Sequence, residues 1–410
     1  MSETKIYVLG GSQSDFQRNW AREGGDIYEL FKETLIDGLA LTKLDAKDIQ
    51  VGHIGNFVGE LFAGQGQLGG FFGHVDAGFA GMPSSRHEAA CASGSMAMFG
   101  AMSDIESGRY EIACVLGIEL MKNVPASDAA ENLRPAAWNG REAQSTPFVW
   151  PSIFSDLIDE YDRRYGIDKQ HLAAISEINF SNAKNNPNAQ TRNWTFPDDG
   201  FAEDESVNPT VVGRMRKNDC GQITDGAAVV FLASEKAASE YAKKRGMALH
   251  DIPQIKGWGH KTSPLLAEQK FQDSAELPYI YPHVRQTFLD AYNRAGIIGI
   301  EDIDGLETHD CFNITQYMAI DHCGLTMPGE SWKAIDEGVI EINGRLPINA
   351  SGGLIGLGHP VGATGVRMAL DCYKQVTGTA GGYQIEQAKN MLTFNVGGSA
   401  TTSACMIIGV

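Results

Sequence analysis

The chain has 410 residues, of which 43% are hydrophobic and 20% charged, a composition typical of a globular protein with two or three domains. Its formal net charge of −18 opposes binding to phosphate backbones and anionic membranes, so nucleic-acid binding and membrane insertion are not expected. No apolar run approaches the ~18 residues that span a bilayer, and no signal peptide is expected. The seven cysteines are scattered without a CxxC pair, which indicates free thiols and a cytoplasmic protein.

Short β-rich runs alternate with helical patterns along the chain, which predicts a layered α/β fold. A helix is expected over residues 28–41, where Leu30, Phe31 and Leu35 recur at helical spacing. Buried strands are expected over residues 6–9, 112–116, 227–232 and 391–396.

Residues 122–220 differ in character from the chain on either side. They hold seven prolines, several clustered asparagines and an acidic run over 198–205. Two helices are expected inside this segment, over 152–166 and 168–184, with Asp168 as the N-cap of the second. We interpret the segment as an inserted loop domain that covers a site. A mobile surface insertion is the alternative interpretation.

A weak internal repeat relates the two ends of the chain. The order of a helix, an Asp-Ile pair and a short strand recurs: residues 30–57 correspond to residues 284–312. Likewise, a small-residue turn opens a helix at both 92–97 and 363–368. Two similarities in the same order predict a duplicated fold. The expected division is an N-terminal half of residues 1–121 and 221–255, the insertion of residues 122–220, and a C-terminal half of residues 256–410.

Three segments hold candidate catalytic residues. The first surrounds Cys91, which lies among small residues just before a predicted helix. Backbone N–H groups and the positive end of the helix dipole favour a thiolate there and can bind an oxyanion. An unpaired cysteine is more often simply buried, so Cys91 by itself does not identify a nucleophile. The other cysteines, Cys114, Cys220, Cys323, Cys372 and Cys405, are interpreted as structural.

The second segment, residues 349–365, is rich in glycine and holds His359 shortly before a helix expected near Gly365. Its glycines miss the spacing of a dinucleotide-binding loop because Gly362 comes one residue late. The sequence also lacks a P-loop motif and the GxSxG motif of serine hydrolases. The glycine-rich segment therefore predicts a histidine surrounded by exposed backbone rather than a nucleotide site.

The third segment, residues 307–312, contains His309, Asp310 and Cys311 in a row. In a strand-like run, His309 and Cys311 point to one face and Asp310 to the other, so the three do not easily share one ion. No metal site is expected.

Together, Cys91 in its small-residue turn, His-Asp-Cys-Phe at 309–312 and Gly-His-Pro-Val-Gly-Ala-Thr-Gly at 358–365 resemble the thiolase superfamily over essentially the whole chain. The commoner thiolases carry Asn-Glu-Ala-Phe where this chain has His-Asp-Cys-Phe, and they carry a second catalytic cysteine in a Cys-x-Gly turn. Here that turn is Asn-Val-Gly-Gly at 395–398, which resembles the sterol-carrier-protein-2 type of thiolase and its acetyl-CoA acetyltransferase relatives. The resemblance implies a duplicated α/β/α/β/α layered fold with mixed five-stranded sheets and an inserted loop domain.

The resemblance also implies catalytic roles. Cys91 would be acylated, His359 would accept its proton, and Cys311 would move the α-proton of acetyl-CoA. One oxyanion site would consist of His359 and a water held by His309, and the other of the backbone N–H groups of Cys91 and Gly397. Residues that bind coenzyme A are not assigned. The basic triplet of Arg214, Arg216 and Lys217 is equally well explained as a solvated surface cluster.

The function implied is a thiolase-type acyltransferase that condenses acetyl-CoA or cleaves 3-ketoacyl-CoA through a cysteine acyl-enzyme. Coenzyme A thioesters are the expected substrates, with no permanently bound cofactor. A decarboxylating ketosynthase, or a C-acyltransferase working with a zinc-ribbon/OB-fold or condensing-enzyme partner, remains an alternative. So does a non-catalytic scaffold or lipid carrier. A homodimer or tetramer acting in lipid metabolism is implied by the resemblance alone.

Overall fold

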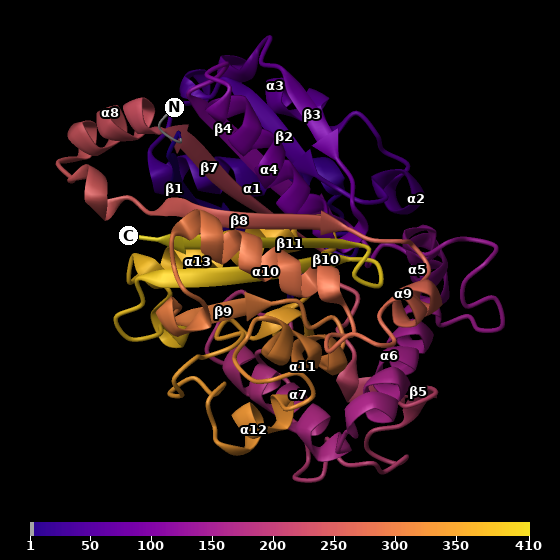
Figure 1. The fold of residues 1–410 in the computed structure, drawn as a ribbon. Coiled ribbons are helices and arrows are strands. Elements are labelled where there is room, and N and C mark those ends of the chain that lie inside the picture. The colour runs from indigo at the N-terminus through magenta and orange to yellow at the C-terminus, as the bar shows by residue number, and fades with distance from the viewer. Residues whose placement is uncertain (1–3) are drawn as a thin grey trace.

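The computed structural model describes residues 4–410, in which nine strands join in the order β3-β2-β4-β7-β1-β8-β11-β10-β9 (Figure 1). The strands are β1 Ile6–Gln13, β2 Val51–Gly55, β3 Ser84–His87, β4 Ile112–Glu119, β7 Gly226–Ser234, β8 Gln254–Thr262, β9 Gly305–Thr308, β10 Asn390–Gly397 and β11 Thr402–Gly409. At the centre, β1 and β8 pair only through Ile6–Ile255 and Tyr7–Gln254, so the sheet divides there into two halves.

The two halves repeat one topology. In the first, β2 runs parallel to β3 and β4, and β7 runs antiparallel to β4 and β1. In the second, β10 runs parallel to β9, and β11 runs antiparallel to β10 and β8. The fifth strand of the second half is reduced to one bridge, Leu306–Ile348, because the chain turns away at Asn349, which has a φ of 55°. The duplication predicted from the sequence is confirmed.

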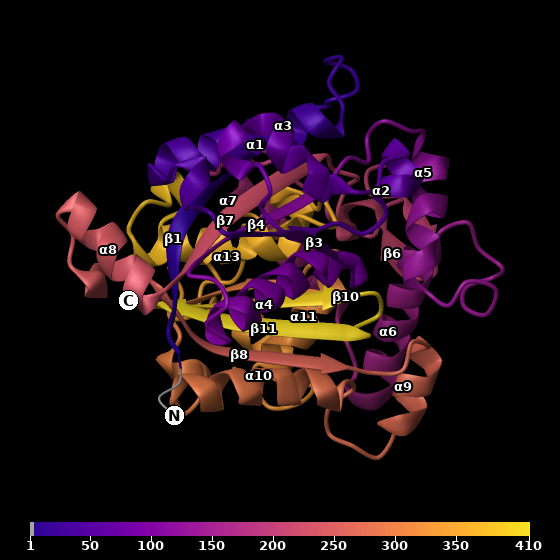
Figure 2. The same cartoon turned by 90° about the horizontal axis from the view of Figure 1, so that it is seen from above.

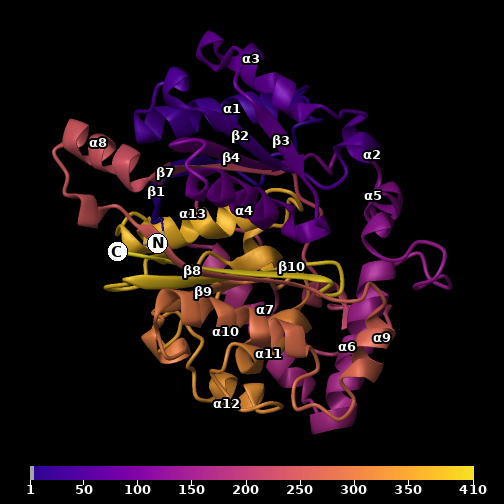
Figure 3. The same cartoon turned by 45° about the horizontal axis from the view of Figure 1, so that its top comes forward.

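Helices lie on both sides of each half and between the halves. The helices are α1 Ile27–Thr42, α2 Gly59–Ala63, α3 Phe72–Val75, α4 Ser93–Glu106, α5 Ala126–Leu133, α6 Val149–Tyr165, α7 Lys169–Ala183, α8 Glu235–Arg245, α9 Ala267–Asp273, α10 Pro282–Ala295, α11 Asn313–His322, α12 Ser331–Asp336 and α13 Thr364–Val376. Figure 3 shows α4 and α13 between the two halves of the sheet. Alternation along β1 explains the layers, since Ile6 and Val8 share a core with α4 and α13, whereas Tyr7 and Leu9 pack with α1. Together with α10 and α11 on the far face, this is the expected α/β/α/β/α arrangement.

The predicted elements are found close to their expected limits. The four predicted strands lie within β1, β4, β7 and β10, and the first predicted helix lies within α1. The two helices predicted in the insertion are α6 and α7, and the Asp168 carboxylate accepts the N–H of Gln170 at 2.9 Å, as an N-cap does. Among the described residues, every helix is too short or too polar to span a bilayer.

Residues 122–220 leave the nine-stranded sheet and form α5, α6, α7 and a small hairpin of β5 Thr210–Val212 and β6 Met215–Arg216. Figure 2 shows α5 and α6 standing at one end of the sheet. Phe154 and Tyr161 of α6 and Ile175 of α7 join the core built around α11. The segment thus starts from the first half of the fold and packs against the second. The residue limits of the predicted three-part division remain a prediction.

Candidate active site

Cys91 lies in a single 3-10 turn directly before α4. Ser93 holds this turn, because its hydroxyl accepts the N–H of Ala89 at 3.0 Å and donates to the carbonyl of Ala90 at 2.6 Å. Ala90 has a φ of 49°. The nucleophile predicted from the sequence therefore sits at the start of a helix, in the small-residue turn that was expected.

His359 follows the glycine-rich loop, and Asp310 organises that loop. The Asp310 carboxylate accepts the N–H groups of Leu354 at 2.5 Å and Ile355 at 3.2 Å. A Cβ on Gly353, whose φ is 61°, would lie 2.4 Å from this carboxylate, so a glycine is required there. The sequence predicted that the Asp310 side chain points away from those of His309 and Cys311. In the structure, the Asp310 carboxylate binds the glycine-rich loop and does not join the other two side chains.

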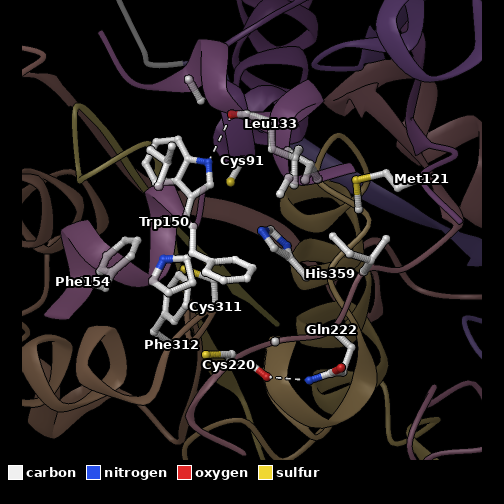
Figure 4. A pocket seen from close by; sticks show the side chains of 18 of the residues that line it. Cys91, Met121, Leu133, Trp150, Phe154, Cys220, Gln222, Cys311, Phe312 and His359 are labelled. Carbon is white, nitrogen blue, oxygen red and sulfur yellow. Dashed lines mark hydrogen bonds between the residues drawn. The ribbon is translucent and has the colours of Figure 1, made fainter. Parts of the chain in front are cut away.

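The predicted catalytic side chains come together where the two halves meet. The Cys91 sulfur and one nitrogen from each of His309 and His359 lie within 4.8 Å of one another. The two imidazole rings are nearly perpendicular, at 89°, with centroids 5.1 Å apart. Cys311 lines the same cavity as Cys91 and His359 (Figure 4). One half of the fold thus supplies Cys91, and the other supplies the remaining three.

The backbone donors near the sulfur include one that the sequence did not distinguish. The N–H of Gly398 donates to the Cys91 sulfur, and Gly398 lines the cavity, whereas Gly397 is not among the lining residues. A Cβ on Gly397 would lie 2.1 Å from the Ala89 carbonyl oxygen, and Gly398 has a φ of 62°. Both glycines are therefore required by backbone packing and conformation. The oxyanion role of the Cys91 and Gly397 N–H groups remains a prediction.

Burial sets the protonation states of the site. It raises the pKa of the Cys91 thiol to about 12, although hydrogen bonds from the N–H groups of Gly398 and of Cys91 itself oppose the shift. The expectation that the start of the helix favours a thiolate is therefore wrong for the resting enzyme, because desolvation outweighs the backbone donors. Burial likewise lowers the pKa of His359 to about 3 and that of His309 well below its usual value. The resting site holds a neutral thiol beside two neutral imidazoles.

An apolar cavity of about 220 Å³ opens beside Cys91. Its aromatic and aliphatic lining includes Phe57, Met121, Leu133, Phe148, Trp150, Phe154, Phe312 and Val361. The indole N–H of Trp150 donates to the carbonyl of Leu133 at 3.1 Å, which fixes the ring (Figure 4). Phe154 stacks on Phe312 with ring centroids 4.6 Å apart. Apart from Phe312 in the His-Asp-Cys-Phe motif, the sequence analysis did not identify these residues as a cavity lining, and for Trp150 and Phe154 the available signal was the apolar face of α6.

Most of the basic triplet is already paired. The Arg214 guanidinium lies 2.9 Å from Asp162, and that of Arg216 lies 3.0 Å from Glu205. These local pairs favour the surface-cluster interpretation over a phosphate site.

The other cysteines fall into two groups. Cys114, Cys323, Cys372 and Cys405 are buried, as expected for structural residues. Cys220 instead lines the cavity, and its thiol donates to the Arg216 carbonyl at 3.2 Å.

Cysteine and histidine side chains are also common zinc ligands in proteins. The Cys91 sulfur and the ring nitrogens of His309 and His359 lie close enough together to hold one ion. The expected absence of a metal remains a prediction.

The fold, together with a cysteine site at the interface between its two halves, defines a cysteine-dependent acyl-transfer enzyme. Residues 6–236 match the family described as the thiolase N-terminal domain, and residues 268–410 match the thiolase C-terminal domain-like family. The chain belongs to the thiolase family and is a thiolase-type acyltransferase.

Individual relatives agree with this family. The chain is 31% identical to an acetyl-CoA acetyltransferase of Methanothermobacter thermautotrophicus over 402 residues, which cover 98% of each protein. It is 26% identical to sterol carrier protein 2 of Rattus norvegicus, over 96% of this chain and 70% of the relative. Among solved structures, the Ltp2-ChsH2(DUF35) aldolase has a TM-score of 0.77 at 20% identity, covering 99% of this chain and 98% of the other. Human mitochondrial 3-ketoacyl-CoA thiolase has a TM-score of 0.63 at 16% identity, covering 100% and 99%. The two structures are similar in fold.

Proposed function

We propose that the protein exchanges acyl groups between coenzyme A thioesters through an acyl-enzyme on Cys91, by Claisen condensation or by thiolytic cleavage of a 3-ketoacyl thioester. The observation that carries this proposal is the meeting of Cys91, His359 and Cys311 at one cavity. A neutral thiol beside a neutral imidazole can lose its proton as it attacks a carbonyl carbon, because His359 is free to accept it.

In the first step, the Cys91 sulfur bonds to the thioester carbonyl carbon while the thiol proton passes to His359. The carbonyl electron pair moves onto the oxygen, which the nearby backbone N–H groups stabilise. When the carbonyl reforms, the bond to the coenzyme A sulfur breaks, and that sulfur takes a proton from Cys311. The Cys311 thiolate then removes the α-proton of a second thioester, and the resulting carbanion bonds to the carbonyl carbon of the acyl-enzyme. When that carbonyl reforms, the bond to the Cys91 sulfur breaks, and the sulfur takes back the proton held by His359. Burial raises the pKa of Cys311 well above its usual value, which supports its use as a strong base once ionised.

The size of the cavity supports an acyl group larger than acetyl. Trp150, Phe154 and Phe312 surround a volume that an acetyl group would leave mostly empty. We therefore propose that this enzyme prefers 3-ketoacyl thioesters with a bulky apolar acyl group over acetoacetyl-CoA.

Acylation is tested by incubating the protein with an acyl-CoA and measuring the mass of the intact chain. We expect one acyl group on the wild-type protein and none on Cys91→Ala, because the substitution removes the sulfur that forms the thioester bond. Circular dichroism serves as the control for folding. Acylation of a folded Cys91→Ala variant would contradict the proposal.

The role of Cys311 is tested separately by proton exchange. We expect Cys311→Ala to become acylated on Cys91 but to lose exchange of the α-protons of acetyl-CoA in D2O, measured by NMR. Its smaller side chain removes the acid/base group and leaves Cys91 in place. Unimpaired exchange would assign the acid/base role to another group.

A partner-dependent activity is the second candidate. The similar Ltp2-ChsH2(DUF35) aldolase is named for two components, which supports the proposal that this chain also assembles with itself or with a partner. A homodimer or tetramer, a zinc-ribbon/OB-fold partner, cytoplasmic location and a part in lipid metabolism all remain predictions. Light scattering of the purified protein tests self-assembly, and activity of the pure chain tests whether a partner is needed.

A further inference from the structure

Asn395 lies at the interface between the two halves of the fold, and its hydrogen bonds allow only one orientation of the side-chain amide. It lies near the end of β10, at the position where the commoner thiolases are expected to carry their second cysteine, and it is fully buried. Its amide nitrogen lies 3.1 Å from the Cys91 carbonyl oxygen and 3.0 Å from Nδ1 of His309. Its amide oxygen accepts the hydroxyl proton of Ser95 at 2.8 Å. A carbonyl oxygen can only accept, so the NH2 group must face Cys91, and its second proton points to His309.

This orientation determines which ring nitrogen of His309 carries the proton. Nδ1 accepts a hydrogen bond from Asn395 and therefore has no proton of its own. Because burial keeps His309 neutral, its single ring proton resides on Nε2.

His359 has a different partner on Nδ1. The Thr364 hydroxyl oxygen lies 2.7 Å from this nitrogen and 2.9 Å from the Pro360 carbonyl oxygen. The Thr364 hydroxyl has a single proton, and it donates this proton to the Pro360 carbonyl, so its oxygen is left to accept Nδ1–H of His359. Nε2 of His359 is buried and has no hydrogen-bond partner in the part of the chain that the structure describes. In this arrangement that nitrogen keeps its lone pair.

We propose that Asn395 and Thr364 are positioning residues that assign opposite tautomers to the two histidines. His309 presents Nε2–H as a hydrogen-bond donor, and His359 presents the lone pair of Nε2 as the acceptor for the Cys91 proton. This inference rests on the proposed function, because it supplies the base and the donor that acyl transfer requires. Asn395 occupies the position of the second cysteine of the commoner thiolases. In this chain the residue at that position orients His309 instead of moving a proton.

The same tautomers affect metal binding. A metal ion bound through Nε2 of His309 would require the lone pair that this proton occupies, while Nδ1 is engaged by Asn395. The Cys91, His309 and His359 set then offers a metal only two of its three ligands.

The tautomers are measured directly by NMR of the full chain labelled with 15N-histidine, without substrate. We expect the ring proton of His309 on Nε2 and that of His359 on Nδ1, with assignments from His309→Gln and His359→Gln variants. Finding both protons on the same type of nitrogen, or the reverse pair, would overturn the inference. This result is independent of acyl-enzyme formation by the wild-type protein, which tests the proposed function itself.

Two substitutions at Thr364 separate positioning from packing. Thr364→Val keeps the shape of the side chain but removes the acceptor, so we expect Cys91 acylation to slow by about a hundredfold, the low end of what general-base catalysis contributes. We expect the acyl-CoA concentration for half-saturation to be unchanged. Thr364→Ser retains the hydroxyl and should stay within about threefold of wild type. A Thr364→Val variant that acylates as fast as Thr364→Ser would show that the Thr364 hydroxyl does not set the tautomer of His359, and would contradict the inference.

Asn395→Asp provides the matching test at the other histidine. A carboxylate only accepts hydrogen bonds, so we expect the ring proton of His309 to move to Nδ1, which the same NMR experiment detects. If the proton stays on Nε2, Asn395 does not set the tautomer. If this variant does not fold, the wild-type spectrum still decides the question.

Discussion

At the scale of single residues, burial rather than an ion pair sets the protonation state of Cys91, the proposed nucleophile. With a pKa of about 12 for Cys91 and about 3 for His359, transfer of the proton between them is unfavourable until a carbonyl carbon is attacked. The thiol of the resting enzyme is thus protected from chance electrophiles, although it is partly exposed to the cavity. Substrate binding and proton transfer become coupled steps.

This protonation state predicts an unusual pH profile for alkylation of Cys91. Burial disfavours the thiolate, so the thiolate fraction should still be growing at pH 10, whereas an ordinary cysteine with a pKa near 8.5 is mostly ionised above about pH 9. We expect the iodoacetamide reaction of Cys91, followed by mass spectrometry of its peptide, to keep accelerating from pH 8 to pH 10. Free cysteine is the control. A plateau at pH 9 would show that Cys91 titrates normally.

At the scale of elements, α6 brings side chains of the insertion to the cavity beside Cys91. Trp150 and Phe154 lie on this helix and line the cavity together with Phe312 from the opposite half of the fold. The helix is held there because its remaining apolar residues, including Leu157 and Ile158, pack into the core around α11. The insertion therefore shapes the part of the site where the acyl group is proposed to bind.

Shortening one of these side chains should change which substrates are accepted. We expect Trp150→Ala to lower kcat/KM for bulky 3-ketoacyl thioesters by about tenfold or more, because it removes apolar contact with the acyl group. The effect on acetoacetyl-CoA should be smaller. Trp332→Ala, at a partly exposed tryptophan on α12 outside the cavity, is the matched control. Equal losses with both thioesters would argue against an acyl-binding role for Trp150.

At the scale of the whole molecule, glycines allow the two halves to approach closely. A Cβ on Gly117 of β4 would lie 2.5 Å from the carbonyl oxygen of Gly362, and one on Gly94 would lie 2.9 Å from the same oxygen. A Cβ on Gly55 would also lie 2.9 Å from the Gly362 oxygen, and 2.6 Å from the Cα of Gly94 in its own half. The loop that carries His359 can therefore reach the Cys91 turn only because these positions lack side chains.

Adding one methyl group at this seam should disturb both stability and catalysis. We expect Gly117→Ala to lower the free energy of unfolding by about 1–3 kcal/mol, as overpacking does, and to slow Cys91 acylation by displacing the His359 loop. Gly73→Ala is the control, because a Cβ at that exposed position on α3 meets nothing within 4 Å. Urea unfolding and acylation rates measure the two effects. A Gly117→Ala variant as stable as Gly73→Ala would contradict the close packing.

Features that depend on local sequence were predictable. Helical spacing placed α1, and Asp168 marked the start of α7, because periodicity and capping act within a few residues. Residues 309–311 lie just after β9, and the alternation expected of an extended run correctly separated His309 and Cys311 from Asp310. The motifs around Cys91, Cys311 and His359 were also sufficient to indicate the family.

Only the tertiary structure decided how these residues are used. The pKa of Cys91 depends on desolvation by all of the protein around it, which outweighs the local helix start. Asn395 bonds to Ser95 and Cys91 in the other half of the fold, and Trp150 of the insertion lines one cavity with Phe312 of the second half. Such contacts join segments separated by hundreds of residues. They are determined by how the duplicated halves pack, and no pattern within a few residues of sequence encodes that packing.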